Sequence, residues 1–269
     1  MTNGRHIFCV ASAFIFLTRR ARSGTITPKG VRDMDTSSYE LRVIAHMESA
    51  FPAKFGIPRQ SGLVNDLRAR IVFETPYRNR DALRGLDGFS HLWLIWVFDR
   101  AARDTWSPTV RPPRLGGNRR LGVFATRSPY RPNPVGLSCV ALERVDGDVL
   151  YVRGADLADG TPSLDIKPYL AYTDAHPDAL GGFAAEPPEA ALSVEIAPSL
   201  LERVPEPERA GLIGVLSHDP RPRYQHDPAR VYGFGFAGLE VRFRVSGTRL
   251  EVVDISRKAT EESETAHFR

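Results

Sequence analysis

The segment that most restricts the fold of this chain is residues 111–138, which read RPPRLGGNRRLGVFATRSPYRPNPVGLS. Its five prolines and four glycines predict specific turns, because proline fixes φ and glycine permits positive φ, so neither a long helix nor a central strand suits the segment. Inside it, the apolar run 121–126 predicts a strand between two loops. The segment has no acidic residue and carries six arginines, Arg111, Arg114, Arg119, Arg120, Arg127 and Arg131.

The arginines of this segment favour a binding site for an anion, since a guanidinium fork fits phosphate or carboxylate. A solvated basic loop is the alternative, and the inserted strand and the position of Asn133 between two prolines argue for a structured site. The net charge of +4 adds little, because residues 1–38 hold six of the 36 basic and two of the 32 acidic residues, which leaves the remainder neutral. The informative charge is therefore the local one.

Cysteine and histidine content points to a protein without disulfides or zinc. Cys9 and Cys139 are too few for a disulfide framework and favour a reducing compartment, the cytoplasm. The seven histidines have no HxxxH or HxxEH spacing, so we expect no metal. The apolar run 7–17 is too short to span a bilayer, and most of its positive charge follows it, unlike in a signal peptide. We therefore expect no membrane association, and we interpret residues 1–38 as an N-terminal extension that is disordered or not native.

Hydrophobic patterning predicts a mainly β chain. A short helix or turn is expected at 78–88, and the Asp146-Gly147 pair predicts a hairpin with a type I′ turn. The apolar run 89–98 predicts a strand buried on both faces at the centre of a sheet. The strands expected in the first part of the chain lie within 39–49, 67–73, 89–98, 134–145 and 148–157.

The second part of the chain predicts a small α+β unit. A Pro/Ala/Glu-rich stretch at 176–190 suggests a linker, and 207–219 predicts a helix. Three strands follow within 230–236, 238–245 and 248–255, and alternation in the middle one places Leu239, Val241, Phe243 and Val245 on one face. The chain is thus divided into an extension (1–38), a main domain (39–180), a small C-terminal domain (181–257) and a tail (258–269).

Three carboxylates, Asp156, Asp159 and Asp165, precede Lys167 and Tyr169. A metal cradle, turn capping and a binding site for polar groups are all open readings. The spacing lacks the order and the final glutamate of an EF-hand, and a polar-group site is favoured.

Five segments resemble the tRNA-methyltransferase O family, also called TsaA-like or YaeB-like. The similarity extends from about Tyr39 to about Ile255, and the segments stand in the family's order. They are IPRQSGLV (57–64), FSHLWLIWVF (89–98), the basic segment 111–138, DLADGTPSLDIKPYL (156–170) and LSHDPRPRY (216–224).

This resemblance implies a fold, a reaction and partners. The fold is a single-sheeted β-barrel methyltransferase domain with a small C-terminal α+β domain, and the protein acts as a homodimer. The reaction is methyl transfer from S-adenosylmethionine to the exocyclic N6 nitrogen of threonylcarbamoyl-adenosine at position 37, in the anticodon loop of tRNA. The chain has no GxGxxG after a strand, as expected for a methyltransferase outside the Rossmann class.

The resemblance also implies site residues. Related members commonly carry His at position 99, so the implied contact of Asp99 with the cofactor is one that its backbone would have to make. The cofactor-binding candidates are Pro58, Arg59, Gln60, Phe98, Asp99, Arg127, Leu137, Asp156, Leu157, Ala158 and Asp159. The candidates for binding tRNA are Arg114, Asn118, Arg119, Arg131, Asn133, Asp219, Arg221 and Arg223.

For catalysis we expect Asp165, or water that it holds, to accept the proton of the attacking nitrogen, with Lys167 and Tyr169 polarising the ureido carbonyl. Tyr130 and Phe124 are possible faces for base stacking, and burial in the core is favoured for Phe124. Two rival functions remain open on sequence alone. One is a non-catalytic RNA-binding module, and the other is a methyltransferase of the same fold that acts on a small molecule or a protein.

Overall fold

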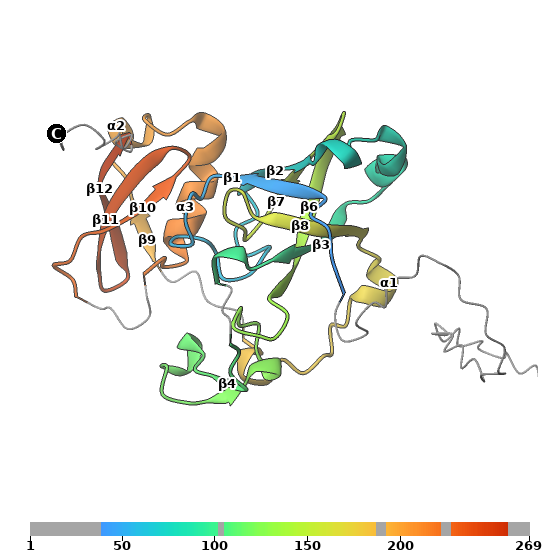
Figure 1. The fold of residues 1–269 in the computed structure, drawn as a ribbon. Coiled ribbons are helices and arrows are strands. Elements are labelled where there is room, and N and C mark those ends of the chain that lie inside the picture. Colours follow the sequence, from blue (N-terminus) through green and yellow to red (C-terminus); the bar gives the residue numbers. More distant parts are fainter. Residues whose placement is uncertain (1–38, 102–104, 187–191, 222–226, 258–269) are drawn as a thin grey trace, which may run out of the picture. The chain divides into compact units, whose positions relative to one another are not determined.

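Six strands close into an antiparallel barrel in the computed structural model (Figure 1). This confirms the prediction of a mainly β fold built on a barrel. The order around the barrel is β1 (Ala45–Ser49), β2 (Arg68–Phe73), β7 (Val149–Arg153), β6 (Val135–Asp146), β3 (His91–Val97) and β8 (Pro162–Pro168).

The structure describes residues 39–101, 105–186, 192–221 and 227–257. The predicted extension 1–38 and the predicted tail 258–269 lie outside these residues. No helix of the described part is both long and apolar enough to cross a membrane.

Strand β3 pairs on both sides, with β6 and with β8, so it is central as expected. The prediction that both of its faces are buried is wrong. Leu92, Leu94 and Trp96 fill the barrel, whereas Trp93 and Ile95 on the outer face are only partly covered. A barrel wall has a single interior side, so its strands alternate even where the outward residues are apolar.

The hairpin between β6 and β7 forms as predicted, but its turn lies one residue later. Asp146 pairs with Val149, so Gly147 and Asp148 are the central residues. Only Gly147 has positive φ (63°), which excludes the predicted type I′ turn and matches the single positive φ of type II′.

The basic segment follows β3, runs into the start of β6 and contains little other regular structure. Its one short strand, β5 (Leu121–Gly122), pairs only with β4 (Thr109–Val110), which immediately precedes the segment. The strand predicted at 121–126 is wrong beyond Gly122, because Val123–Ala125 form a 3₁₀ turn. Short apolar runs do not distinguish strand from helix, and no third strand is present here to extend the ladder.

The C-terminal part is a four-stranded sheet with a packed helix, drawn in orange and red in Figure 1. The predicted helix is α3 (Arg209–Ser217), and the three predicted strands are β10 (Tyr232–Phe236), β11 (Leu239–Ser246) and β12 (Arg249–Arg257). The sequence did not predict β9 (Ser193–Glu195), which pairs parallel to β12.

The remaining helical elements are short. They are α1 (Ala171–Asp174), α2 (Pro198–Leu201) and 3₁₀ turns at Thr75–Tyr77, Arg80–Leu83, Leu86–Gly88, Asp99–Ala101, Pro113–Leu115, Gly182–Ala184 and Glu206–Glu208. Those at Arg80–Leu83 and Leu86–Gly88 confirm the short helix or turn predicted at 78–88.

The loop between β1 and β2 is anchored in the core of the C-terminal sheet. Phe51, Val64 and Leu67 are at most 4% exposed and belong to the same apolar cluster as the inward residues of β10, β11, β12 and α3. The backbone of Gly56 lies against the ring of Phe234, where any Cβ would overlap the ring. Residues 41–269 accordingly form one unit by contacts, and the division at residue 180 stays a prediction.

Candidate active site

A buried polar relay ends at Asp156, just after β7. The indole Nε1 of Trp96 donates to Ser138 Oγ (3.0 Å), and Ser138 Oγ donates to Asp156 Oδ1 (2.5 Å). Burial raises the pKa of Asp156, opposed by the Ser138 hydrogen bond and by the positive charge of Arg127. Burial removes this carboxylate from water and lowers the local dielectric. Its hydrogen bonds and charge interactions with the protein are therefore stronger than they would be at the surface.

The loop that carries Gln60 is fixed beside this carboxylate. Gly62 N–H donates to the carbonyl of Gly154 (2.9 Å), and Ser61 Oγ accepts from the N–H of Cys139 (3.1 Å). From the basic segment, the guanidinium of Arg127 donates to Gln60 Oε1. The structure therefore brings together three of the residues predicted to bind the cofactor, Gln60, Arg127 and Asp156.

Two neighbours of Gln60 in the predicted cofactor set face different surroundings. Pro58 is half-buried, whereas Arg59 is exposed and lines the same cleft as Arg127.

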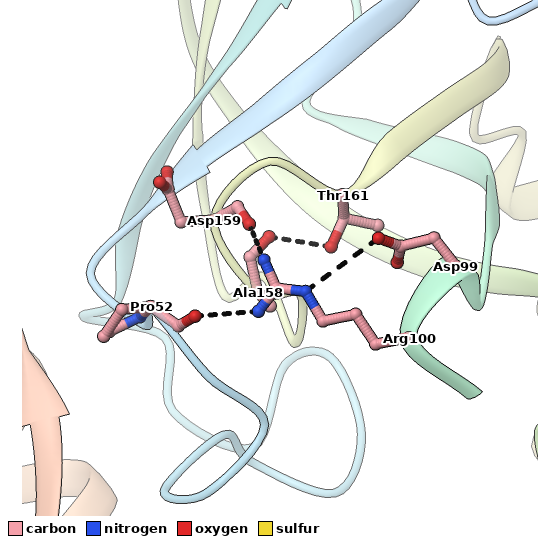
Figure 2. Close-up of polar contacts among 6 residues, drawn as sticks. All are labelled: Pro52, Asp99, Arg100, Ala158, Asp159 and Thr161. Atoms are coloured by element: carbon pink, nitrogen blue, oxygen red, sulfur yellow. Dashed lines mark hydrogen bonds and ion pairs between the residues drawn. The ribbon is translucent and has the colours of Figure 1, made fainter. Parts of the chain in front are cut away.

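Arg100 ties the end of β3 to the turn that contains Asp159 (Figure 2). Its guanidinium donates to the carbonyls of Asp159 (2.5 Å) and Pro52 (2.8 Å) and lies 3.9 Å from the carboxylate of Asp99. Thr161 Oγ1 closes the turn by donating to the carbonyl of Ala158 (2.7 Å). Asp99 is thus engaged through its side chain with Arg100, and the prediction of a backbone contact to a cofactor remains a prediction.

The segment from Asp156 to Asp159 has a carboxylate at each end, and the two carboxylates lie in different surroundings. Asp159 Oδ1 accepts from the N–H of Ser49 (3.1 Å), and Asp159 lines a cavity of about 850 Å³ that is distinct from the cleft of Arg127. Between the ends, the side chains of Leu157 and Ala158 are buried (1% and 8% exposed). Contacts of these two residues with a ligand would have to come from their backbone atoms.

Phe98 and Leu137 are also in the predicted cofactor set and carry apolar side chains. The ring of Phe98 packs against Trp96 with centroids 4.2 Å apart, and its N–H donates to the carbonyl of Pro134 (2.8 Å). Leu137 is 55% exposed on the outer face of the barrel, opposite Ile95.

The three predicted catalytic residues lie along β8 and immediately after it. Lys167 Nζ forms an ion pair with Asp165 Oδ2 (2.8 Å), and the ring of Tyr169 is 5.6 Å from that of Trp93. Asp165 and Lys167 pair with Ile95 and Trp93, which places them on the outer face of the barrel. Ser138 and Trp96 point inward, so within one subunit Asp165 and Lys167 do not lie on the same side of the wall as the relay to Asp156.

A cleft of about 1930 Å³ opens between the basic segment and residues 180–186. Arg114 and Arg119, both predicted to bind tRNA, line it, and the guanidinium of Arg114 donates to the carbonyl of Glu186. Glu186 is the only acidic residue among those described as lining the cleft. Its arginines are Arg59, Arg111, Arg114, Arg119, Arg120 and Arg127.

The other predicted tRNA-binding residues of the basic segment are not among the described residues that line the cleft. Asn118 and Asn133 are exposed, and Arg131 Nη1 donates to the carbonyl of Thr126 (3.4 Å). The favoured burial of Phe124 is wrong, since its side chain is 72% exposed. The cause is the 3₁₀ turn, which points Val123 inward and leaves Phe124 outside.

In the C-terminal motif, Asp219 and Arg221 form a closed pair. Arg221 Nε and Nη2 donate to the two carboxylate oxygens of Asp219 (2.8 and 2.9 Å), and Arg221 is only 8% exposed. The hydrogen bond to Asp219 raises the pKa of Arg221. This guanidinium fork is occupied within the chain, and Arg223 lies outside the described residues.

Sequence reasoning missed Ser138, Trp96 and Arg100. Ser138 and Trp96 lie in apolar runs that predict strands. Such a pattern does not indicate that the hydroxyl of Ser138 and the indole N–H of Trp96 form a hydrogen bond. Arg100 offered a signal, because it follows directly after two predicted cofactor residues. Among the described residues, no three His, Cys, Asp or Glu side chains are grouped as metal ligands.

Comparison with known proteins identifies the family. The profile of the tRNA-methyltransferase O N-terminal domain matches residues 46–175, and that of the TrmO C-terminal domain matches residues 189–258. A tRNA (adenine(37)-N6)-methyltransferase of Escherichia coli (strain K12) is 42% identical over 80% of this chain and 97% of its own. A relative from Pseudomonas aeruginosa, 41% identical over 77% of this chain and 92% of its own, is named "Putative S-adenosylmethionine-dependent methyltransferase RcsF".

The fold comparison agrees with these matches. A crystal structure of TrmO from P. aeruginosa superimposes with a TM-score of 0.70 at 34% identity and covers 84% of this chain and all of that one. The two profiles, the relatives and the barrel lead to one conclusion: this chain belongs to the tRNA-methyltransferase O family.

Proposed function

We propose that this protein is an S-adenosylmethionine-dependent methyltransferase that methylates N6 of threonylcarbamoyl-adenosine at position 37 of tRNA in the cytoplasm. The relatives named as tRNA (adenine(37)-N6)-methyltransferases support the reaction, and the nearly complete coverage of the E. coli protein supports its transfer to this chain. The threonylcarbamoyl group, the cofactor and the compartment are parts of this proposal.

The observation that carries the proposal is the position of Arg127. This residue lines the arginine-rich cleft, donates to Gln60 and acts electrostatically on Asp156. Arg127 therefore connects the arginine-rich cleft, which suits a polyanion, with the buried polar groups around Asp156. A methyltransferase needs this junction, because its target nitrogen and its methyl donor must meet.

The residues present fit S-adenosylmethionine by their chemistry. Asp156 offers a carboxylate to a cation or to ribose hydroxyls, Arg127 offers a fork to a carboxylate, and Phe98 offers an apolar ring. Pro58, Arg59 and Gln60 contribute a loop fixed beside Asp156. When bound, the cofactor supplies an activated methyl group, and the protein supplies orientation and electrostatics.

The target side of the reaction is assigned to the outer face of β8 and to the cleft. The carboxylate of Asp165, which forms an ion pair with Lys167, is the group that accepts a proton from the attacking nitrogen. An arginine of the cleft pairs with the carboxylate of the threonylcarbamoyl group in a bidentate contact. Recognition of that carboxylate makes the earlier modification of the adenosine a requirement.

A homodimer is part of the proposal. The outer face of β3 and β6 carries Leu137 (55% exposed) beside the partly covered Trp93, Ile95 and Cys139. A second copy that covers this face would remove apolar surface from water and surround Asp165 and Lys167 with protein. Sedimentation of the purified protein measures the oligomeric state.

The test is methyl transfer to defined tRNAs. Purified protein and labelled S-adenosylmethionine are incubated with tRNA that carries threonylcarbamoyl-adenosine at position 37 and with the same tRNA bearing bare adenosine, and the nucleosides are identified by mass spectrometry. We expect N6 methylation of the modified tRNA alone. Equal turnover of bare adenosine would refute the assignment of an arginine to the threonyl carboxylate.

Two further measurements separate the rival functions. Binding of tRNA without any binding of S-adenosylmethionine, measured by calorimetry, would identify a non-catalytic RNA-binding module. Methyl uptake into small metabolites but not into tRNA would identify a small-molecule enzyme.

Asp156→Asn should weaken cofactor binding in calorimetry while tRNA binding persists, and the exposed Asp87→Asn serves as the matched control.

A further inference from the structure

Two large aromatic side chains stand exposed at the edge of the arginine-rich cleft. Trp106 is 51% exposed and Phe124 is 72% exposed, and their rings lie with centroids 6.2 Å apart at an angle of 33°. Soluble proteins seldom leave paired large aromatics in water, so such a pair marks a binding surface. The cofactor and catalytic residues proposed above include neither ring, and of the two only Phe124 is considered as a stacking face from the sequence.

The small β4–β5 hairpin builds this pair. Thr109 is opposite Gly122 in the ladder, and Val123 N–H continues it by donating to the carbonyl of Pro108 (2.9 Å). Trp106 precedes one strand and Phe124 follows the other, so the backbone pairing holds their two rings next to each other. Val123, between them in the fold, is 1% exposed and anchors the turn.

The surroundings of the pair are cationic. Phe124 lines the cleft together with six arginines, and Arg120 Nη1 lies 3.5 Å from Thr109 Oγ1 on the same hairpin. Aromatic faces beside arginines form the combination that single-stranded nucleic acids require, because bases stack on the rings while the guanidiniums meet phosphates. A small carboxylate ligand would leave the two rings without a role.

We propose that Trp106 and Phe124 form a stacking platform for one unpaired nucleobase of the anticodon loop, adjacent to the nucleotide that is methylated. This inference rests on the proposed function and adds to it a recognition subsite for single-stranded RNA. The platform selects an open loop over a duplex, since a base inside a helix cannot reach the rings.

The test measures binding of an anticodon stem-loop RNA to the full-length protein. Combined Trp106→Ala and Phe124→Ala substitutions should raise the Kd about 5- to 150-fold, the range for losing one stacked base. Trp106→Phe with Phe124→Tyr should restore most of the affinity. Tyr172→Ala, at an 87% exposed aromatic residue that does not line the cleft, is the matched control and should leave the Kd unchanged.

A loop scan locates the base. Stem-loops with a single abasic site at successive loop positions are titrated against wild type and the double alanine variant. At one loop position, the abasic site should weaken binding to wild type but should not weaken binding to the double variant any further. 2-Aminopurine at that position should be quenched on binding wild type and remain bright with the variant.

Each outcome decides the question. If wild type neither binds nor methylates tRNA, the proposed function fails. If wild type binds and methylates but the double variant binds equally well, the platform alone is refuted. An equal loss of S-adenosylmethionine affinity would assign the rings to the cofactor, and a change in sedimentation would assign them to contact between subunits; both results overturn the inference. Thermal unfolding should be unchanged, because both side chains are exposed.

Discussion

Asp156 is the residue on which burial and charge act most directly in this fold. Its carboxyl is held by Ser138, which is in turn held by Trp96, and Arg127 is its nearby cation. Burial dominates and raises its pKa. Folding therefore favours the protonated form of this side chain, and keeping it ionised at neutral pH costs stability.

The contribution of Asp156 to the free energy of unfolding should depend on pH. A carboxyl with a raised pKa contributes stability that is complete below its ordinary pKa of about 4 and is lost as pH rises through the folded-state value. The free energy of unfolding of wild type, relative to Asp156→Asn, should therefore fall with rising pH across this window and then level off. Urea titrations at a series of pH values measure it.

Ser138→Ala provides a directional control for this prediction. The Ser138 hydrogen bond lowers the pKa of Asp156 against the effect of burial. Its removal should move the window to higher pH. A difference that is independent of pH, or a shift to lower pH, would contradict the account.

Gly136 is required by the ring beside it. A Cβ at this position would overlap the indole of Trp96, which is 8% exposed and fixed by Ser138. Gly136→Ala should therefore destabilise the protein by about 1–3 kcal/mol through overpacking. Gly122→Ala is the matched control: Gly122 has φ −57° and nothing within 4 Å of a built Cβ, so its change should stay within about 0.5 kcal/mol.

At the scale of elements, one side chain that follows β3 helps to hold the turn at Asp159. Arg100 holds the carbonyls of Asp159 and Pro52 together. Arg100→Ala should cost about 1 kcal/mol, since a charged donor is lost at a partly exposed site. Amide exchange should rise at Asp159 and Gly160, whose N–H groups donate to Phe51 and Met47.

An exposed ion pair elsewhere serves as the control for this change. Arg84 pairs with Asp81 on the surface, with both side chains at least 74% exposed. Arg84→Ala should alter neither stability nor exchange at the turn. Unchanged protection of Asp159 and Gly160 in Arg100→Ala would show that the turn holds itself.

Elements with strong local signals could be predicted from sequence, and elements that depend on partners could not. The helix α3 and the hairpin of β11 and β12 follow from apolar periodicity and a Gly turn. The apolar run at 121–126 misled because only Thr109–Val110 pairs with it. Strand β9 has three residues and exists only because β12 offers an open edge, which a local pattern cannot reveal.

The candidate site shows the same division. The resemblance supplied Gln60, Arg127 and Asp156, which the structure brings together. Ser138 could not be found, because a serine inside an apolar strand gains its role only from distant contacts. Arg100 was missed although it directly follows two predicted cofactor residues, because its contacts to Asp159 and Pro52 are distant in sequence.

At the scale of the whole molecule, the barrel and the C-terminal sheet have separate apolar cores, and the loop between β1 and β2 contributes side chains to the core of the sheet. Phe51, Val64 and Leu67 would become exposed if the chain ended at residue 180. Such a truncated chain should bind the dye ANS and unfold without a sharp transition, since it exposes several large apolar side chains. A chain that ends at residue 257 is the control and should unfold like the full-length protein. A truncated monomer that binds no ANS and melts sharply would contradict this dependence of the β1–β2 loop on the C-terminal sheet.

The anchoring of the β1–β2 loop also affects how variants of this protein should be interpreted. The stretch with Gln60 begins and ends in side chains held by the C-terminal sheet, at Phe51 and Val64. Any substitution that loosens that sheet will change the geometry at Gln60, and an activity screen will register it as a defect in chemistry. Inactive alleles in the last third of the gene therefore need a measurement of folding before a role in recognising RNA is assigned to them.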